Sequence, residues 1–169
     1  MKNLSWNLRI AIGGVVLIIL SVGGFFAWYS VSQGAYDGPA EYTPYPNVEP
    51  IAAEETEGRT FYRFIAPDDH QAVQAFFAEQ GFECQAFNGN VQEGPTIRQN
   101  VFVRATCLLE RIHPLGFQQT VQVSIQPERT ALEYENNNPQ GAIVGGGIPT
   151  GRTFITEQST WDTSGLFGG

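Results

Sequence analysis

The stretch IAIGGVVLIILSVGGFFAWY, residues 10–29, decides how the rest of this chain is organised. It carries no charge, and the uncharged run continues to Tyr36. At about 1.5 Å rise per residue, a helix of this length spans about 30 Å, the thickness of a bilayer's hydrocarbon core. We therefore predict a transmembrane helix over residues 10–32, preceded by a short stub over residues 1–9.

A cleaved signal peptide and a buried core helix are the two alternatives to a membrane anchor. Lys2 and Arg9 supply the basic start of a signal peptide, and Ser30-Val31-Ser32 is a weak cleavage site. The apolar run is longer than the usual apolar region of a signal, however. It also ends in Trp28 and Tyr29, residue types that are enriched at the membrane–water boundary. These features favour a retained anchor.

The distribution of charge predicts the orientation of the chain. Two of the nine basic residues, Lys2 and Arg9, precede the span, whereas all 17 acidic residues follow it. Because Lys and Arg close to a span stay inside, we expect a single-pass protein of the cell membrane, with a cytoplasmic N-terminus and an extracytoplasmic domain. The acidic domain argues against binding of nucleic acid. It suits a basic partner, or it is a solvated surface.

Small residues in the span suggest a neighbouring helix. Gly23 and Ala27 are four residues apart, a spacing at which two membrane helices can approach closely. We predict that these two residues form a helix–helix contact with another membrane subunit. Glycines that the membrane helix tolerates without any partner are the alternative.

Residues 33–58 are predicted to be a linker rich in proline and tyrosine. Proline at this density favours an extended chain. Tyrosine is unusual in a pure spacer, and its ring offers a large contact area at a low entropy cost. We therefore predict that Tyr36, Tyr42 and Tyr45 face a partner. A plain spacer is equally compatible with the composition.

The predicted domain begins with a strand and a helix. Residues 60–66 are rich in aromatic side chains, which favour strands, and Pro67 ends the run. Asp68 is a good N-cap for a helix over residues 69–80, and Gly81 can take the left-handed conformation that closes it. The apolar residues of this helix share one face: Ala72, Val73, Phe76 and Phe77.

Cys84 and Cys107 define the register of a predicted hairpin. Residues 82–87 and 100–112 read as strands, and pairing the two cysteines places the turn within residues 93–96, where glycine and proline favour a reversal. Outside the cytoplasm an even pair of cysteines normally forms a disulfide, so we predict a Cys84–Cys107 bridge. Two buried free thiols are the alternative.

Further strands are expected after this hairpin. Residues 117–126 alternate between apolar and polar side chains. For their apolar side to face the same way as that of the preceding strand, either the loop after residue 112 has five residues or a bulge lies near residues 108–109. We expect residues 127–129 to turn and residues 130–135 to return, with Leu132 opposite Ile125. The inward residues of the first of these strands are Val121, Val123 and Ile125.

Residues 136–169 are predicted to form a Gly-rich loop, a late strand over residues 152–158 and a tail. The tail, with Trp161, Leu166 and Phe167, is expected to be a frayed end, with an interaction peptide as the alternative. The fold class is therefore α+β, a single N-terminal transmembrane helix followed by a small antiparallel sheet with one packed helix, and its domain core covers residues 59–135.

No catalytic, cofactor or metal site is predicted. Residues 146–153, GGIPTGRT, come close to a phosphate-binding loop, but arginine replaces the required lysine and a strand follows where a helix is needed. We expect Asp68 and Asp69 to complement a helix dipole beside a surface His70, without binding a metal. Too few histidines and free thiols remain to build a nucleophile–base pair, so we expect no enzyme.

Two functions follow as hypotheses. The first is a non-catalytic accessory or structural subunit of a bacterial membrane protein complex, whose glycine-bearing span packs against larger integral membrane subunits. The second is a free-standing anchored module that binds a ligand or peptide outside the cytoplasm. A concave apolar pocket on the domain would favour the second hypothesis. A linker and tail that only another chain can order would favour the first.

Overall fold

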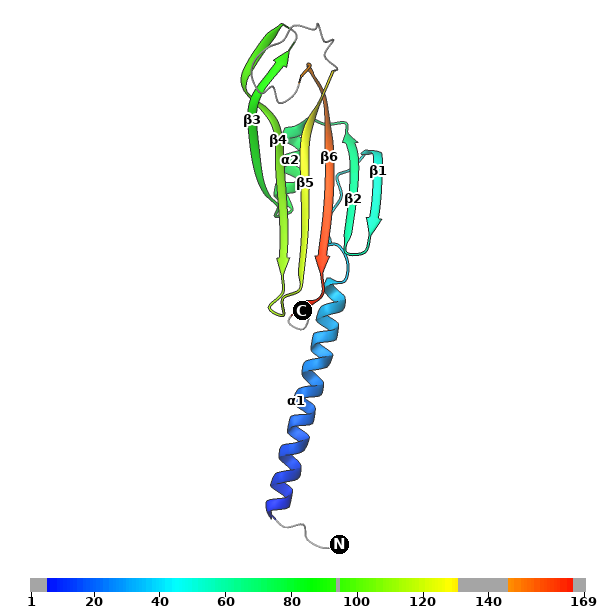
Figure 1. Ribbon diagram of the computed structural model, residues 1–169, viewed down its shortest axis with the longest axis vertical. Coiled ribbons are helices and arrows are strands. Elements are labelled where there is room, and N and C mark those ends of the chain that lie inside the picture. The colour runs from blue at the N-terminus through cyan, green and yellow to red at the C-terminus, as the bar shows by residue number, and fades with distance from the viewer. Residues whose placement is uncertain (1–5, 94, 131–145, 166–169) are drawn as a thin grey trace.

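The computed structural model describes residues 6–93, 95–130 and 146–165 and contains two helices and six strands (Figure 1). In chain order the elements are α1 (Trp6–Tyr36), β1 (Glu49–Thr56), β2 (Arg59–Ala66), α2 (His70–Glu79), β3 (Glu83–Glu93), β4 (Thr96–Ile112), β5 (Gln118–Arg129) and β6 (Pro149–Asp162).

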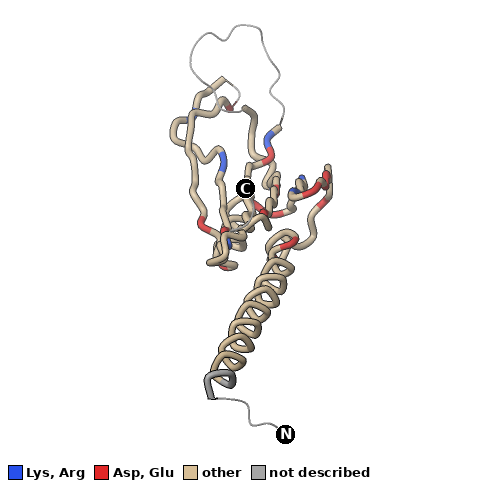
Figure 2. The backbone as a smooth tube through the Cα atoms, turned by 60° about the horizontal axis from the view of Figure 1, so that its bottom comes forward, with Lys and Arg blue, Asp and Glu red and all other residues tan. Residues whose placement is uncertain are grey.

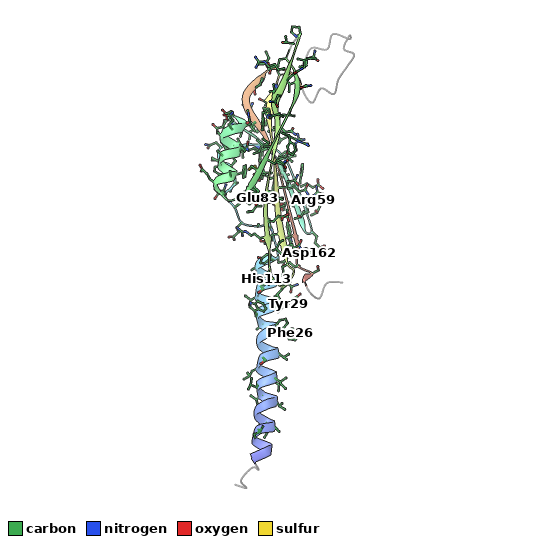
Figure 3. All side chains as sticks on the ribbon, turned by 90° about the vertical axis from the view of Figure 1, so that its left-hand side faces the viewer. Phe26, Tyr29, Arg59, Glu83, His113 and Asp162 are labelled. Atoms are coloured by element: carbon green, nitrogen blue, oxygen red, sulfur yellow. A yellow bond between two sulfur atoms is a disulfide. The ribbon has the colours of Figure 1, made fainter. Side chains whose placement is uncertain are left out.

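All six strands form one antiparallel sheet in the order β1-β2-β6-β5-β4-β3. β6 is last in the chain, yet it lies between β2 and β5 in the interior of the sheet. α2 lies on one side of the sheet, and α1 leaves the base of the sheet roughly along the strand direction (Figures 1 and 3). The predicted α+β class, with an N-terminal apolar helix and an antiparallel sheet carrying one short helix, is confirmed.

The β3–β4 hairpin has the register that the cysteines predicted. Cys84 lies opposite Cys107, and Glu93 lies opposite Thr96 at the turn. The two sulfur atoms are bonded, which confirms the Cys84–Cys107 disulfide. Bulges interrupt the pairing between Phe87 and Val91, so the far half of the hairpin bends away from a regular ladder.

β5 supplies the centre of the core. Val121, Val123 and Ile125 are fully buried, as their alternation predicted. The loop before β5 has five residues, because Ile112 pairs with Gln118, and the first of the two predicted solutions is therefore the correct one. The bulge near residues 108–109 is not needed, since pairing is continuous there.

The predicted turn at residues 127–129 is wrong. Pro127 continues β5 and pairs with Thr153 of β6, next to a register shift. Proline is tolerated at this point because the pairing of β5 with β4 ends at Ile125, so no β4 carbonyl needs the missing N–H group. Ile125 lies between Ala105 and Ile155, so the expected pairing with Leu132 is also wrong. Residues 131–135 lie outside the described residues.

α2 is bounded by local signals, as expected, although its cap is shifted by one residue. Asp69, not Asp68, is the N-cap, and its carboxylate accepts hydrogen bonds from the N–H groups of Gln71 and Ala72. Gly81 takes a positive φ of 89° and, with Phe82, closes the helix in a Schellman motif. The buried face of α2 is anchored by Val73 and Phe77.

α1 contains the predicted span and ends at Tyr36, beyond the predicted boundary at residue 32. Ile10–Tyr36 is the one helix of the described chain that is long and apolar enough to cross a membrane, and none of its most apolar window is buried. Figure 2 shows no charged position along the described helix from Ile10 to its end. A single N-terminal apolar helix of this kind is compatible with a membrane anchor.

The predicted linker over residues 33–58 is largely part of the folded domain. Residues 33–36 end α1, and Glu49–Thr56 forms the edge strand β1, paired with β2. Acidic and alanine residues have low strand propensity, so the sequence of β1 did not reveal a strand. β1 pairs with β2 because a tight turn at Gly58, which has a positive φ of 75°, brings the two strands together.

Candidate functional site

The end of α1 packs against the base of the sheet through aromatic rings. His113 and Phe117 belong to the five-residue loop between β4 and β5, and they meet Trp28, Tyr29 and Tyr36 of the helix. The ring centroid of His113 lies 5.8 Å from that of Trp28 and 5.4 Å from that of Tyr36, and the ring centroids of Phe117 and Tyr29 lie 5.1 Å apart. Figure 3 shows Tyr29 and His113 at this junction. We call these five residues the aromatic collar.

Hydrogen bonds secure the same junction. The Nε2 group of the buried Gln119 on β5 donates to the carbonyl oxygens of Gly38, at 2.9 Å, and Ala35, at 3.4 Å. Carbonyls at the end of a helix lack partners within it, so this side chain caps α1. Gln33 donates from Nε2 to the carbonyl oxygen of Thr163, at 3.2 Å. The helix is therefore joined to the sheet without a spacer.

Tyr36, Tyr42 and Tyr45, which were predicted to face a partner, make contacts within their own chain, and their contact with a partner stays a prediction. Tyr36 belongs to the aromatic collar of its own chain, and Tyr45 is buried in its own core. The Tyr42 hydroxyl donates to Glu157, and the Tyr45 hydroxyl donates to Asp68, both at 2.8 Å. Burial and the Asp68 carboxylate raise the pKa of Tyr45 to about 12. Tyr42 therefore holds the extended segment of residues 37–48 on the sheet, and Tyr45 holds it against α2.

Glu157 is the most unusual polar residue of the core. It lies on the interior strand β6, is only 3% exposed, and its Oε1 atom has no hydrogen-bond partner among the described atoms. Burial raises the pKa of this carboxyl, because the charged form loses its hydration, while the hydrogen bond from Tyr42 acts in the opposite direction. Burial and the neighbouring Glu157 carboxylate in turn raise the pKa of Tyr42.

The face of the sheet opposite α2 has no Asp, Glu, Lys or Arg at its centre. Eight side chains of β4, β5 and β6 alternate with buried residues and so point away from α2. We call them the uncharged face: Thr106, Leu108, Thr120, Gln122, Ser124, Thr156, Gln158 and Thr160. Strand neighbours at its border are charged, with Arg63 paired beside Thr156 and Glu110 beside Thr120.

A groove of about 490 Å³ lies at the end of the sheet away from α1. We call it the distal groove, and its apolar walls include Phe87 and Phe154. The guanidinium carbon of Arg104 lies 5.1 Å from the ring centroid of Phe87, and none of the described acidic groups lies within ion-pair distance of it. Arg129, which also lines the groove, pairs instead with Glu93, at 3.5 Å.

The residues weighed for metal binding serve other contacts. Asp69 caps α2, and Asp68 accepts from Tyr45. His70 stacks on Phe102 with 4.0 Å between ring centroids, and burial lowers its pKa. No cluster of three or more His, Cys, Asp or Glu side chains suited to a metal occurs within the described ranges.

The structure also shows where two other sequence motifs lie, the glycine-rich stretch of residues 146–153 and Gly23 of the span. Pro149–Thr153, the second half of the GGIPTGRT stretch, begins β6, so no helix N-terminus follows it. A Cβ atom added at Gly23 meets no described atom within 4 Å, which leaves that side of α1 open. The contact of Gly23 and Ala27 with a second helix stays a prediction.

Sequence reasoning missed Gln119, His113 and Glu157 as residues of a site. The one signal for the collar was the Trp28-Tyr29 pair, which marks a membrane boundary. Comparison with known proteins adds no further assignment: no protein-family model, no curated protein and no solved structure matches this chain.

Proposed function

We propose that this protein is a single-pass, membrane-anchored, non-catalytic accessory subunit of a membrane protein complex, with its sheet on the extracytoplasmic face. The orientation rests on Lys2 and Arg9, which precede the span, and on the acidic residues, which all follow it. The junction of α1 with the sheet carries the proposal. A helix capped by Gln119 and packed into the aromatic collar presents the domain to its neighbours in one orientation.

The uncharged face is the surface that we propose for docking. Interface centres are depleted of charged residues, and their rims are polar and charged. The eight side chains of this face fit that description, since Arg63 and Glu110 border them. The fixed junction holds this face parallel to α1, so a neighbour in the membrane can contact the helix and the sheet together (Figure 1).

Two matched substitutions test the proposal. Gln122 is the exposed residue at the centre of the uncharged face, and Gln71 is an exposed residue on α2. A buried, unpaired charge opposes association, so Gln122→Glu is expected to remove membrane subunits that co-purify stoichiometrically in mild detergent, whereas Gln71→Glu retains them. The proposal fails if the unmodified chain emerges alone and monodisperse, or if both variants keep the same subunits.

The distal groove supports a second candidate function, a free-standing anchored module that binds a ligand or peptide. Arg104, free of any described ion pair, and the rings of Phe87 and Phe154 suit a carboxylate carried on a flat apolar group. Benzoate titrated against the full chain in detergent is the probe. Arg104→Gln is expected to abolish its binding, and Arg63→Gln, an exposed arginine on β2, is the control. Equal binding by both variants contradicts this function.

A further inference from the structure

The base of the sheet lies at a height that the aromatic collar defines. If the hydrocarbon core begins at Ile10, Trp28 lies roughly 27 Å along the helix axis and Tyr36 roughly 39 Å. The hydrocarbon core is about 30 Å thick, and each headgroup layer adds roughly 5–8 Å. The His113 ring contacts both Trp28 and Tyr36, so its level lies between theirs. The midpoint of that range, about 33 Å, falls within the outer headgroup layer.

The chemistry of the loop suits this level. Residues 112–117, IHPLGF, contain no Asp, Glu, Lys or Arg, and both Ile112, at 66%, and Pro114 are exposed. Leu115 and Phe117 are turned inward and buried. A segment of this composition presents apolar groups to whatever lies beneath the domain.

The backbone N–H groups of residues 113–116 have acceptors within the loop itself. The N–H of His113 donates to the carbonyl of Phe117 at 2.9 Å, and that of Gly116 donates to the carbonyl of His113 at 2.8 Å. The N–H of Leu115 donates to Nδ1 of His113 at 3.2 Å, and Pro114 has no N–H group. A backbone N–H group without an acceptor is costly where water is scarce. A loop whose N–H groups all have acceptors at residues 113–116 is therefore suited to a low-polarity layer.

We infer that the base of the domain, Ile112–Phe117, is a second membrane-contact site that sits in the headgroup layer of the bilayer that α1 spans. The inference rests on the proposed anchor. Its occupant is the phospholipid interface, and the contact is apolar, since the segment holds no Asp, Glu, Lys or Arg and exposes Ile112 and Pro114. Continuity with α1 through the aromatic collar makes helix and base one membrane-facing surface.

Three exposed aliphatic residues at different heights allow a direct test. Leu20 lies in the middle of the span, Ile112 at the base and Ile97 near the β3–β4 turn, and they are 69%, 66% and 50% exposed. Each is changed to cysteine in the full chain, labelled with a nitroxide and reconstituted in phosphatidylcholine vesicles. The native cysteines are bridged, so only the new thiol reacts. Collision rates with oxygen and with a water-soluble nickel chelate are then compared by electron paramagnetic resonance.

The expected result is a graded ratio of oxygen to nickel collisions, highest at Leu20, intermediate at Ile112 and lowest at Ile97. Protein shielding lowers both collision rates, so it leaves the ratio unchanged. An Ile112 ratio equal to that of Ile97, with Leu20 still oxygen-dominated, overturns the inference and leaves the anchor standing. Nickel-dominated collisions at Leu20 refute the anchor itself.

Discussion

Replacing Tyr42 by phenylalanine tests whether the segment after α1 is held on the sheet by the buried Glu157. Among the described residues, the Tyr42 hydroxyl donates the hydrogen bond to this carboxyl, to Oε2 at 2.8 Å, and Oε1 has no partner. Tyr42→Phe removes that donor and keeps the ring, which packs edge-on against Phe82 with 5.6 Å between centroids. The substitution therefore isolates the hydrogen bond from the packing.

The expected loss depends on the charge of Glu157. A hydrogen bond to a charged group contributes about 1.5–3 kcal/mol, against about 1 kcal/mol for a neutral pair. The pKa of Glu157 is raised by burial, so the protonated carboxyl stabilises the fold fully below its ordinary value of 4.5, and this contribution is lost as the pH rises through the raised value. Tyr42→Phe removes a bond that favours the charged form, so it costs more free energy of unfolding at pH 8 than at pH 4.

Thermal unfolding of the full chain in mild detergent, followed by near-ultraviolet circular dichroism, measures the effect. At about 4 °C per kcal/mol for a domain of about 100 residues, the Tm is expected to fall by about 6–12 °C at pH 8 and by less at pH 4. Tyr36→Phe is the matched control, because Tyr36 contributes ring contacts to the collar. In a Glu157→Gln background the cost of Tyr42→Phe should lose its pH dependence. Equal losses at both pH values, or a pH dependence that survives Glu157→Gln, refute this account.

Two substitutions and one reduction address the core, a helix end and the hairpin. Phe117→Ala removes a fully buried ring of the aromatic collar and should lower the free energy of unfolding, measured by urea denaturation, by about 3–5 kcal/mol. A loss below about 1 kcal/mol would contradict the close packing of this ring. In Gly81→Ala the added Cβ meets no neighbouring atom, but the residue must keep its positive φ, so the free energy of unfolding should fall by about 1–2 kcal/mol in the same assay. An unchanged free energy of unfolding would argue against the left-handed cap. Reduction of the Cys84–Cys107 bridge, which closes a loop at a sequence separation of 23, should cost about 3 kcal/mol; an unchanged Tm on reduction would exclude a stabilising bridge.

Local patterns predicted the parts of the fold that local interactions determine. The alternation of Val121, Val123 and Ile125 identified the buried face of β5, because side chains of a strand alternate between its two faces. Gly81 marked the end of α2, since a left-handed residue is favoured there. Cys84 and Cys107 predicted the hairpin register because a disulfide needs its two residues close together.

The wrong predictions concern two segments whose local sequence signals argue against a strand. Residues 49–56 were predicted to be part of a linker, but they pair with β2 because the turn at Gly58 brings the two strands together. Residues 127–129 were predicted to turn, but β6 arrives beside them from the end of the chain. Proline and acidic residues carry local signals against strands, and the pairing of neighbouring strands overrides those signals.

Three features could be predicted from the sequence: an apolar helix able to span a membrane, an antiparallel sheet with a capped helix, and a disulfide. Each of these follows from hydropathy, periodicity or spacing within a short window. Only the tertiary structure decided that β6 enters the interior of the sheet, that Tyr42 reaches Glu157, and that Gln119 caps α1. The hydrogen-bonded partners in those contacts are separated by 81 to 115 positions in the chain, and their meeting depends on how all the elements pack at once.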